Sequence, residues 1–142
     1  MDITVKAAAL LDKCGDVVLS SVSENGFPRP CVLAKIKSEG IHKLWFSTGL
    51  KGTKTIHFLK NPKAGVCFYS GGDGVTLTGK VTVRTDAATR AALWVDWFIN
   101  HFPGGVDDPN YCVLEFEAEE ATFWIDHEFL TLKGDQLRFP AR

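Results

Sequence analysis

Strict alternation of apolar and polar residues is the clearest pattern in this sequence, and it predicts β-strands. Over residues 75–84, valine, leucine and glycine occupy one face, while threonine, lysine and arginine occupy the other. Gly79 in the middle of this segment indicates a bend or bulge, as the corners of barrels require. Apolar runs predict further strands over residues 17–22, 30–37, 41–47, 64–70, 111–118 and 122–126.

Helical spacing of apolar residues marks two other segments. Residues 4–13 predict a short amphipathic helix. Residues 54–60 predict a second helix, in which Ile56 and Leu59 face inward and which Pro62 stops.

Capping and turn signals complete the outline. Residues 85–86 cap a third helix, predicted over residues 87–100 with an aromatic stripe. Glu-Asn-Gly at 24–26 predicts a hairpin, residues 71–74 a glycine-rich loop, and the tail from Phe129 a weak hairpin around Gly134. Six or more short antiparallel strands with glycine-marked bends indicate a mainly β fold, a small closed barrel with helices at its rim.

Residues 44–62 carry the most distinctive candidate chemistry. They read as a strand, a tight turn and the start of a helix, where free backbone N–H groups and the helix dipole favour an anion. Hydroxyl and ammonium groups gather at the same point. The residues that supply them are Ser47, Thr48, Lys51, Thr53 and Lys54. The alternative is an amphipathic helix with a solvated lysine face.

Composition narrows the class of protein. A chain of 142 residues with 45% hydrophobic and 23% charged residues is typical of one soluble domain. The net charge of −1 gives no general attraction to nucleic acid or membranes, and no apolar run approaches a membrane span. Four scattered cysteines without a C-x-x-C pair indicate free thiols in a reducing, cytoplasmic setting, and the histidine spacing predicts no metal site.

Charge is unevenly distributed along the chain. Residues 41–72 contain lysines but no acidic residue, whereas residues 91–132 contain acidic residues but no lysine or arginine. These two segments either pair with each other, within one chain or between subunits, or form two solvated surfaces.

Three stretches together resemble a known family. They are residues 26–35 (GFPRPCVLAK), residues 44–64 (from LWFSTG to NPKA) and residues 97–126 (with FPGGVDDP and TFWID). In order and spacing they resemble the pyridoxamine 5'-phosphate oxidase-like FMN-binding split barrels, in the general-stress-protein branch. The resemblance covers about residues 3–126. It implies an antiparallel six-stranded split β-barrel as a single domain over 1–142, with a poorly matched tail at 127–142.

The resemblance also implies a homodimer with FMN in a groove at its interface. By position, Lys54 contacts the FMN phosphate, Thr53 stands where the oxidases have an arginine, and Lys51 replaces that charge. Ser47 and Thr48 lie near the flavin, and Gly74 stands where the oxidases have a glutamine. The implied cofactor-binding residues are Pro30, Cys31, Val32, Leu33, Lys35, Ser47, Thr48, Lys51, Thr53, Lys54 and Gly74.

The function implied is that of a small flavin-dependent oxidoreductase, with a nicotinamide cofactor as electron donor. The alternatives are a non-catalytic flavin-binding module related to stress, or a relative that uses haem or a deazaflavin. The tail has no counterpart of the tryptophan–arginine segment with which the oxidases bind their substrate, so pyridoxamine phosphate oxidation is not expected. The aromatic residues Trp94, Trp97, Phe98 and Phe102 either cover the flavin or belong to the core or interface; Trp97 and Phe102 are expected at the interface.

Overall fold

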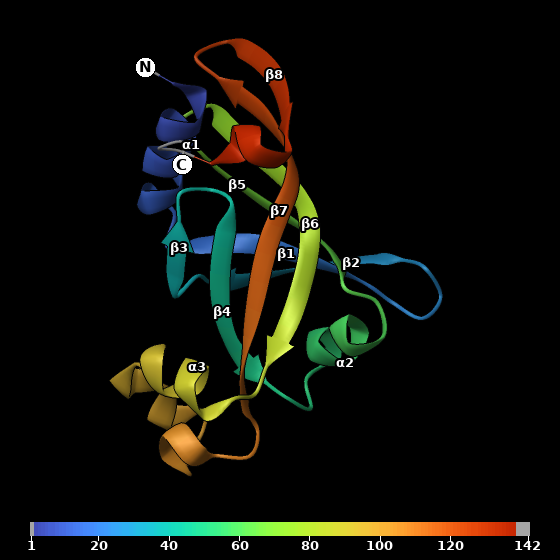
Figure 1. The fold of residues 1–142 in the computed structure, drawn as a ribbon, viewed down its shortest axis with the longest axis vertical. Helices are drawn as coiled ribbons and strands as arrows, with labels where there is room; N and C mark the ends of the chain where they lie inside the picture. The colour runs from blue at the N-terminus through green and yellow to red at the C-terminus, as the bar shows by residue number, and fades with distance from the viewer. Residues whose placement is uncertain (1, 139–142) are drawn as a thin grey trace.

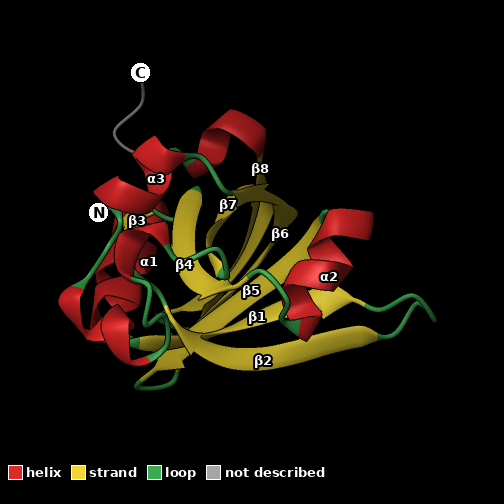
Figure 2. Cartoon of the chain, turned by 90° about the horizontal axis from the view of Figure 1, so that it is seen from below, coloured by secondary structure: helices red, strands yellow, loops and turns green. Residues whose placement is uncertain are grey.

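Within the described residues 2–138, eight strands form one antiparallel sheet that curls on itself in this computed structural model (Figures 1 and 2). The strand order is β2-β1-β5-β6-β7-β4-β3, and β8 pairs with β7 beside this path. The strands are β1 (Asp16–Val22), β2 (Pro28–Ala34), β3 (Lys37–Glu39), β4 (Lys43–Gly49), β5 (Lys63–Ser70), β6 (Asp73–Arg84), β7 (Tyr111–Ile125) and β8 (Glu128–Lys133). The helices are α1 (Ile3–Lys13), α2 (Thr53–Lys60), α3 (Ala87–Ala92) and the 3-10 turns η1 (Asp96–Asn100), η2 (Gly105–Asp107) and η3 (Gly134–Leu137).

The two ends of the sheet lie close together. β2 ends at Ala34 and β3 begins at Lys37, so two residues connect strands from opposite ends of the order. In this link, the N–H of Ile36 donates to the backbone oxygen of Trp45 on β4 at 2.9 Å. The predicted continuous strand over 30–37 is therefore wrong, because the chain here passes from one end of the sheet to the other.

The predicted fold class is confirmed. The sheet is a curled, antiparallel half-barrel of the split-barrel kind, with few helices. The short β3 and β8 bring the number of strands from the expected six to eight over residues 2–138.

The inner face of the sheet forms the main core. Alternate residues of the strands point inward, which is the period-two pattern seen in the sequence. Each such side chain contributes roughly 1.5–3 kcal/mol on full burial. The largest buried members on the strands are Leu19, Leu44, Phe46, Leu77, Leu114, Phe116 and Phe123, and α1 adds Ala7, Leu10 and Leu11.

Gly79 marks a bulge, as predicted. The pairing of β6 with β7 shifts register between Thr78 and Gly79. A Cβ on Gly79 would lie 2.0 Å from the backbone oxygen of Glu117, so only glycine lets the two strands approach this closely.

β7 is one continuous strand of 15 residues, and the prediction of two strands here is wrong. It pairs with β6 on one edge, and with β4 and then β8 on the other. The acidic residues between the two predicted strands lie at the surface, close to lysines of the neighbouring strands. Glu119 lies 3.8 Å from Lys80, and Glu120 lies 4.0 Å from Lys133.

α2 begins where the sequence predicts, but its inward face differs. Thr55 and Phe58 are buried, whereas Ile56 and Leu59 are 44% and 62% exposed. The hydroxyl of Thr55 donates to the backbone oxygen of Gly49 at 2.8 Å, which turns this face toward the sheet.

The helix predicted over 87–100 is wrong in its second half. Asp86 caps α3 as expected, accepting from the N–H of Thr89 at 3.0 Å, but α3 ends at Ala92. The chain resumes as η1, which places Phe98 edge-on to Trp94 and near Tyr111. Packing of the aromatic rings thus overrides the helical pattern.

Two turns fall at other positions than predicted. The loop expected over 71–74 is confined to Gly71 and Gly72, which have positive φ, and Gly74 belongs to β6. The last hairpin turns at Asp126 and His127 rather than around Gly134, and the end of the expected hairpin at Phe139 lies outside the described residues.

Candidate functional site

A cavity of about 370 Å³ opens where the end of β2 approaches β4. We call it the split cavity, because residues from the two ends of the sheet line it together. The end of β2 with its link to β3 forms one side of the cavity, the end of β4 forms the second, and the segment around η1 forms the third. Figure 1 places α3 and the following turns together at one end of the molecule, away from β8. The lining residues are Leu33, Ala34, Ile36, Ser47, Thr48, Gly49, Trp97, Phe98, His101, Phe102 and Asn110.

The β4 side of the cavity carries a buried hydroxyl. Ser47 Oγ has no partner with good hydrogen-bond geometry within the part of the chain that the structure describes, but the hydroxyl of Tyr111 lies close enough to interact with it. Its neighbour Tyr111 donates its own hydroxyl to the backbone oxygen of Arg90 at 2.8 Å. A buried polar atom without a well-formed hydrogen bond is costly, so Ser47 Oγ is suited to meet a polar ligand in the cavity.

The turn that follows β4 leads directly to the start of α2. Gly52 precedes α2 and has no side chain to cap it, and the first helical bond is made by the N–H of Ile56 to Gly52 at 3.1 Å. The N–H groups of residues 53–55 come before that bond and point out of the helix. Backbone donors and the positive end of the dipole are thus presented beside the end of β4.

Two lysines add full charge at this point. Lys51 is exposed and Lys54 is half-buried. Neither has a carboxylate within ion-pair distance among residues 2–138, whereas Lys43 pairs with Glu117 at 3.6 Å and Lys60 pairs with Glu24. The basic segment is therefore only partly neutralised: among residues 2–138, Lys51, Lys54 and Lys63 make no ion pair, and the first two lie at the start of α2.

The aromatic side of the cavity consists of two parts. Phe98 and Phe102 are buried with Tyr111 in a small second core, so the expectation of Phe102 at an interface is wrong. Trp97 is 49% exposed, and its ring lies edge-on to Phe98 at 4.7 Å and to His101 at 5.8 Å. Trp97 and His101 thus form the part of this wall that a ligand can reach.

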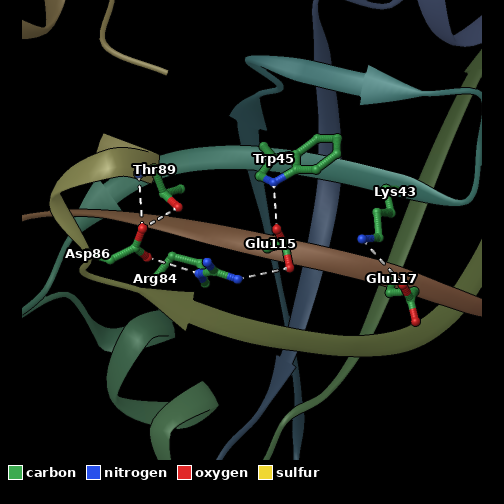
Figure 3. Close-up of polar contacts among 7 residues, drawn as sticks. All are labelled: Lys43, Trp45, Arg84, Asp86, Thr89, Glu115 and Glu117. Carbon is green, nitrogen blue, oxygen red and sulfur yellow. Dashed lines mark hydrogen bonds and ion pairs between the residues drawn. The ribbon is translucent and has the colours of Figure 1, made fainter. Parts of the chain in front are cut away.

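A polar network behind the cavity joins β4, β7, β6 and α3 (Figure 3). The indole N–H of Trp45 donates to Glu115 at 2.9 Å, and Arg84 lies 3.6 Å from the other oxygen of Glu115. Arg84 also bonds Asp86 at 3.0 Å. Hydrogen bonds from Thr89, and then from Arg84, hold the pKa of Asp86 well below its ordinary value. These contacts fix α3 on the sheet.

The thiol beneath β4 is not suited to be a nucleophile. Cys112 Sγ lies 3.5 Å from the backbone oxygen of Thr48. Burial raises the pKa of Cys112 to about 11, so the reactive thiolate is scarce at neutral pH.

The cofactor-binding residues expected from the sequence fall into two groups, apart from Gly74. Ser47, Thr48, Lys51, Thr53 and Lys54 lie together at the end of β4 and the start of α2. On β2, Leu33 lines the cavity, Cys31 shares its face, and Pro30 and Val32 point to the outer face; Lys35 follows in the link to β3.

Gly74 lies apart from these groups. It pairs with Trp124 on β7, whereas Ser47 pairs with Val113. At about 3.3 Å per residue, the two positions are about 35 Å apart along β7. Gly74 therefore belongs to a different part of the surface.

Sequence reasoning did not identify Ala34, Ile36, Gly49, His101 and Asn110, which also line the cavity.

Across residues 2–138, no group of three or more His, Cys, Asp or Glu side chains is placed to hold a metal ion. No helix in that same range has the length and apolar character needed to cross a membrane.

The loop that carries Asn110 gives a prediction for acid pH. Both carboxylate oxygens of Asp108 accept backbone N–H groups, from Asn110 and from Gly104, each at 2.9 Å. These bonds, first that of Asn110, hold the pKa of Asp108 below its ordinary value of 3.8. Because the pKa of Asp108 is lower in the folded state, these hydrogen bonds stabilise the fold fully above the ordinary pKa of 3.8. This stabilisation is lost as the pH falls through the lower, folded-state pKa.

We therefore expect the amide resonances of Gly104 and Asn110 to shift at acid pH with a midpoint below pH 3.8. An NMR titration measures this, with Asp107, the exposed neighbouring carboxylate, as the comparison. A midpoint for the two amides above 3.8 contradicts the assigned hydrogen bonds.

The chain matches a known protein family over most of its length. The family model described as pyridoxamine 5'-phosphate oxidase matches residues 3–125, which confirms the resemblance noted in the sequence. No curated protein is significantly similar in sequence to this chain.

Solved structures share the fold. A protein from Clostridium acetobutylicum, related to general stress protein 26 of Bacillus subtilis, is 28% identical, with 95% of this chain and 96% of that chain covered and a TM-score of 0.83. A pyridoxamine 5'-phosphate oxidase-related, FMN-binding protein of Nostoc punctiforme is 16% identical, with 93% of each chain covered and a TM-score of 0.67. A haem-binding protein of Mycobacterium smegmatis is 12% identical, with 94% of this chain and 59% of that chain covered and a TM-score of 0.76.

Proposed function

Since the chain belongs to the pyridoxamine 5'-phosphate oxidase family, we propose that it is a flavoprotein that holds FMN in the split cavity. The observation that carries this proposal is the start of α2, where uncapped N–H groups and the unpaired Lys51 and Lys54 follow the cavity-lining residue Gly49 across a short turn. A phosphate there receives backbone hydrogen bonds and two ammonium charges. Leu33 and Ala34 at the end of β2, which line the same cavity, would then border the flavin ring.

The residues that hold FMN in this proposal divide by chemistry. Lys54 and Lys51 bind the phosphate together with the N–H and hydroxyl of Thr53. Ser47 and Thr48 offer hydroxyls at the end of β4, and the lack of a well-formed hydrogen bond at Ser47 Oγ supports this role. The edge of β2 at residues 30–33 and Lys35 border the ring. FMN when bound supplies hydride chemistry, and the protein supplies binding, orientation and exclusion of water.

The proposed activity is flavin-dependent oxidation and reduction, with a nicotinamide cofactor as electron donor, in the cytoplasm. The four cysteines are all free, which suits a reducing compartment. Pyridoxamine phosphate oxidation is not part of the proposal, because residues 128–137 fold as β8 and η3 against the sheet without the substrate-binding segment of the oxidases.

The visible absorption spectrum of the purified protein tests the cofactor. We expect flavin bands, and tight binding of FMN when it is added to stripped protein. A non-catalytic flavin-binding module gives the same bands but no bleaching with NADH or NADPH. A haem spectrum, which His101 on the cavity wall would permit, or a lack of affinity for FMN overturns the proposal.

We also propose that two copies form a homodimer with FMN at the interface. On the outer face of the sheet, uncharged residues that pair across neighbouring strands form a continuous row. They are Val32, Val18, Cys67, Thr76, Thr122 and Thr131. The adjacent row contains Tyr69, Gly74, Trp124 and Phe129, around a depression of about 320 Å³. Tyr69 and Phe129 are 79% and 69% exposed, which is typical of an interface.

This dimer also gives Gly74 a place in the flavin site. Gly74 is too far along β7 to reach the split cavity of its own chain, so a contact with FMN requires the cavity of a second copy. A glycine in the depression leaves space there for a ligand or a partner side chain.

Light scattering at micromolar concentration is expected to give about twice the chain mass of 15.6 kDa. Dilution below the dissociation constant of the dimer should release FMN in the same transition, since each site loses part of its wall. A monomer that keeps one FMN per chain contradicts the shared site.

A further inference from the structure

Asn110 connects the split cavity with the turn before α2. Its side-chain oxygen Oδ1 accepts the N–H of Lys51 at 3.1 Å, and its backbone oxygen accepts the N–H of Leu50 at 2.7 Å. One residue therefore fixes two successive N–H groups of the turn. The same residue lines the cavity.

The side chain of Asn110 lies against the backbone of Gly49, the last residue of β4. A Cβ on Gly49 would lie 3.0 Å from Nδ2 and 3.5 Å from Cγ of Asn110. The hydrogen bond from Lys51 identifies Oδ1 as the acceptor, so Nδ2 is the atom turned toward Gly49. The absence of a side chain at position 49 thus allows Asn110 to reach the turn.

Asn110 is itself held firmly. Its N–H donates to Asp108 Oδ1 at 2.9 Å, and Asp108 Oδ2 accepts the N–H of Gly104. Arg90 donates to the backbone oxygen of Asp108 at 3.2 Å. The loop over 104–110 is therefore held in place by its own hydrogen bonds. The turn that it contacts lies between Gly49 and Gly52 and would otherwise be free to change conformation.

We propose that Asn110 is a positioning residue for the phosphate end of the cofactor. By fixing the N–H of Lys51 it sets the path of the chain into α2, and with it the directions of Lys51, Lys54 and the free N–H groups. The inference rests on the proposed FMN site. It adds to that site a residue, distant in sequence, whose acceptor oxygen decides how well the phosphate is bound.

The first test uses the protein without cofactor and compares two variants. Asn110→Ala removes the acceptor, whereas Asn110→Asp keeps one in the same place. Amide hydrogen exchange followed by NMR should show loss of protection at Lys51 in Asn110→Ala and retained protection in Asn110→Asp. Leu50 should stay protected in both, because its partner is the backbone oxygen. Unchanged protection of Lys51 in Asn110→Ala overturns the inference.

The second test measures affinities for FMN and riboflavin by flavin fluorescence. Asn110→Ala should weaken FMN binding about tenfold, as expected for one hydrogen bond, and change riboflavin binding less than about twofold. Asn100→Ala, at an exposed asparagine of η1, is the control and should change neither. Equal losses of affinity for both ligands would mean that Asn110 acts on the part that FMN and riboflavin share, and would overturn its role at the phosphate.

The two proposals fail in distinguishable ways. If the wild-type protein binds no FMN, both the proposed function and this inference are refuted. If the wild type binds FMN and Asn110→Ala binds it equally well, only the inference about Asn110 is refuted.

Discussion

Replacement of Lys54 by alanine is expected to weaken FMN binding by about ten- to a hundredfold. Lys54 is half-buried on the first turn of α2 and has no carboxylate partner over residues 2–138, so its charge is available to a phosphate. A charge-assisted hydrogen bond of this kind contributes roughly 1.5–3 kcal/mol. Titration of stripped protein with FMN, followed by quenching of flavin fluorescence, measures the change.

Lys60→Ala on the last turn of α2 is the matched control. Lys60 is exposed and pairs with Glu24, away from the start of the helix, so its removal should leave the affinity for FMN unchanged. Riboflavin lacks the phosphate and should bind the wild type and Lys54→Ala equally. An unchanged FMN affinity in Lys54→Ala, or a similar loss in Lys60→Ala, would refute the placement of the phosphate.

Gly79→Ala is expected to cause the largest loss of stability of any change considered. The added Cβ would lie 2.0 Å from the backbone oxygen of Glu117 and 2.9 Å from Cα of Ala118, and backbone cannot move aside as a flexible side chain can. β6 and β7 must separate at the bulge, which adjoins the main core. We expect a loss of about 3 kcal/mol or more in the free energy of unfolding.

Urea unfolding followed by circular dichroism measures this loss. Gly65→Ala on the neighbouring β5 is the control, because the nearest atom to its Cβ is 3.7 Å away, an ordinary contact. Its effect should stay below about 1 kcal/mol. Equal stabilities of the two variants would mean that the strands do not approach at Gly79 as described.

Local patterns in the sequence predicted the fold where the deciding contacts are also local. The alternation over 75–84 and the glycine at its centre were sufficient for β6 and its bulge. Prediction failed where distant packing decides. The inward face of α2 depends on the hydroxyl of Thr55 reaching Gly49, and the early end of α3 depends on rings that gather around Tyr111.

The candidate site divides in the same way. Its phosphate end is contiguous in sequence, so strand, turn and helix start could be recognised together. Asn110 and His101 come from a loop whose approach to β4 is a tertiary contact, and no spacing in the sequence indicates it. The position of Gly74 depends on the register of β6 with β7, which only the structure provides.

The central place of β7 in the sheet affects how the protein is made. β4 and β6 are complete once Arg84 has been synthesised, but the strand that lies between them ends only at Ile125. At about 5–20 residues per second, a ribosome needs several seconds to supply it. During that interval, apolar residues such as Phe46 and Val81 lack the strand that covers them. A chain that stalls before Tyr111 keeps two unpaired strand edges, and we expect such nascent chains to depend on chaperones and to aggregate in their absence.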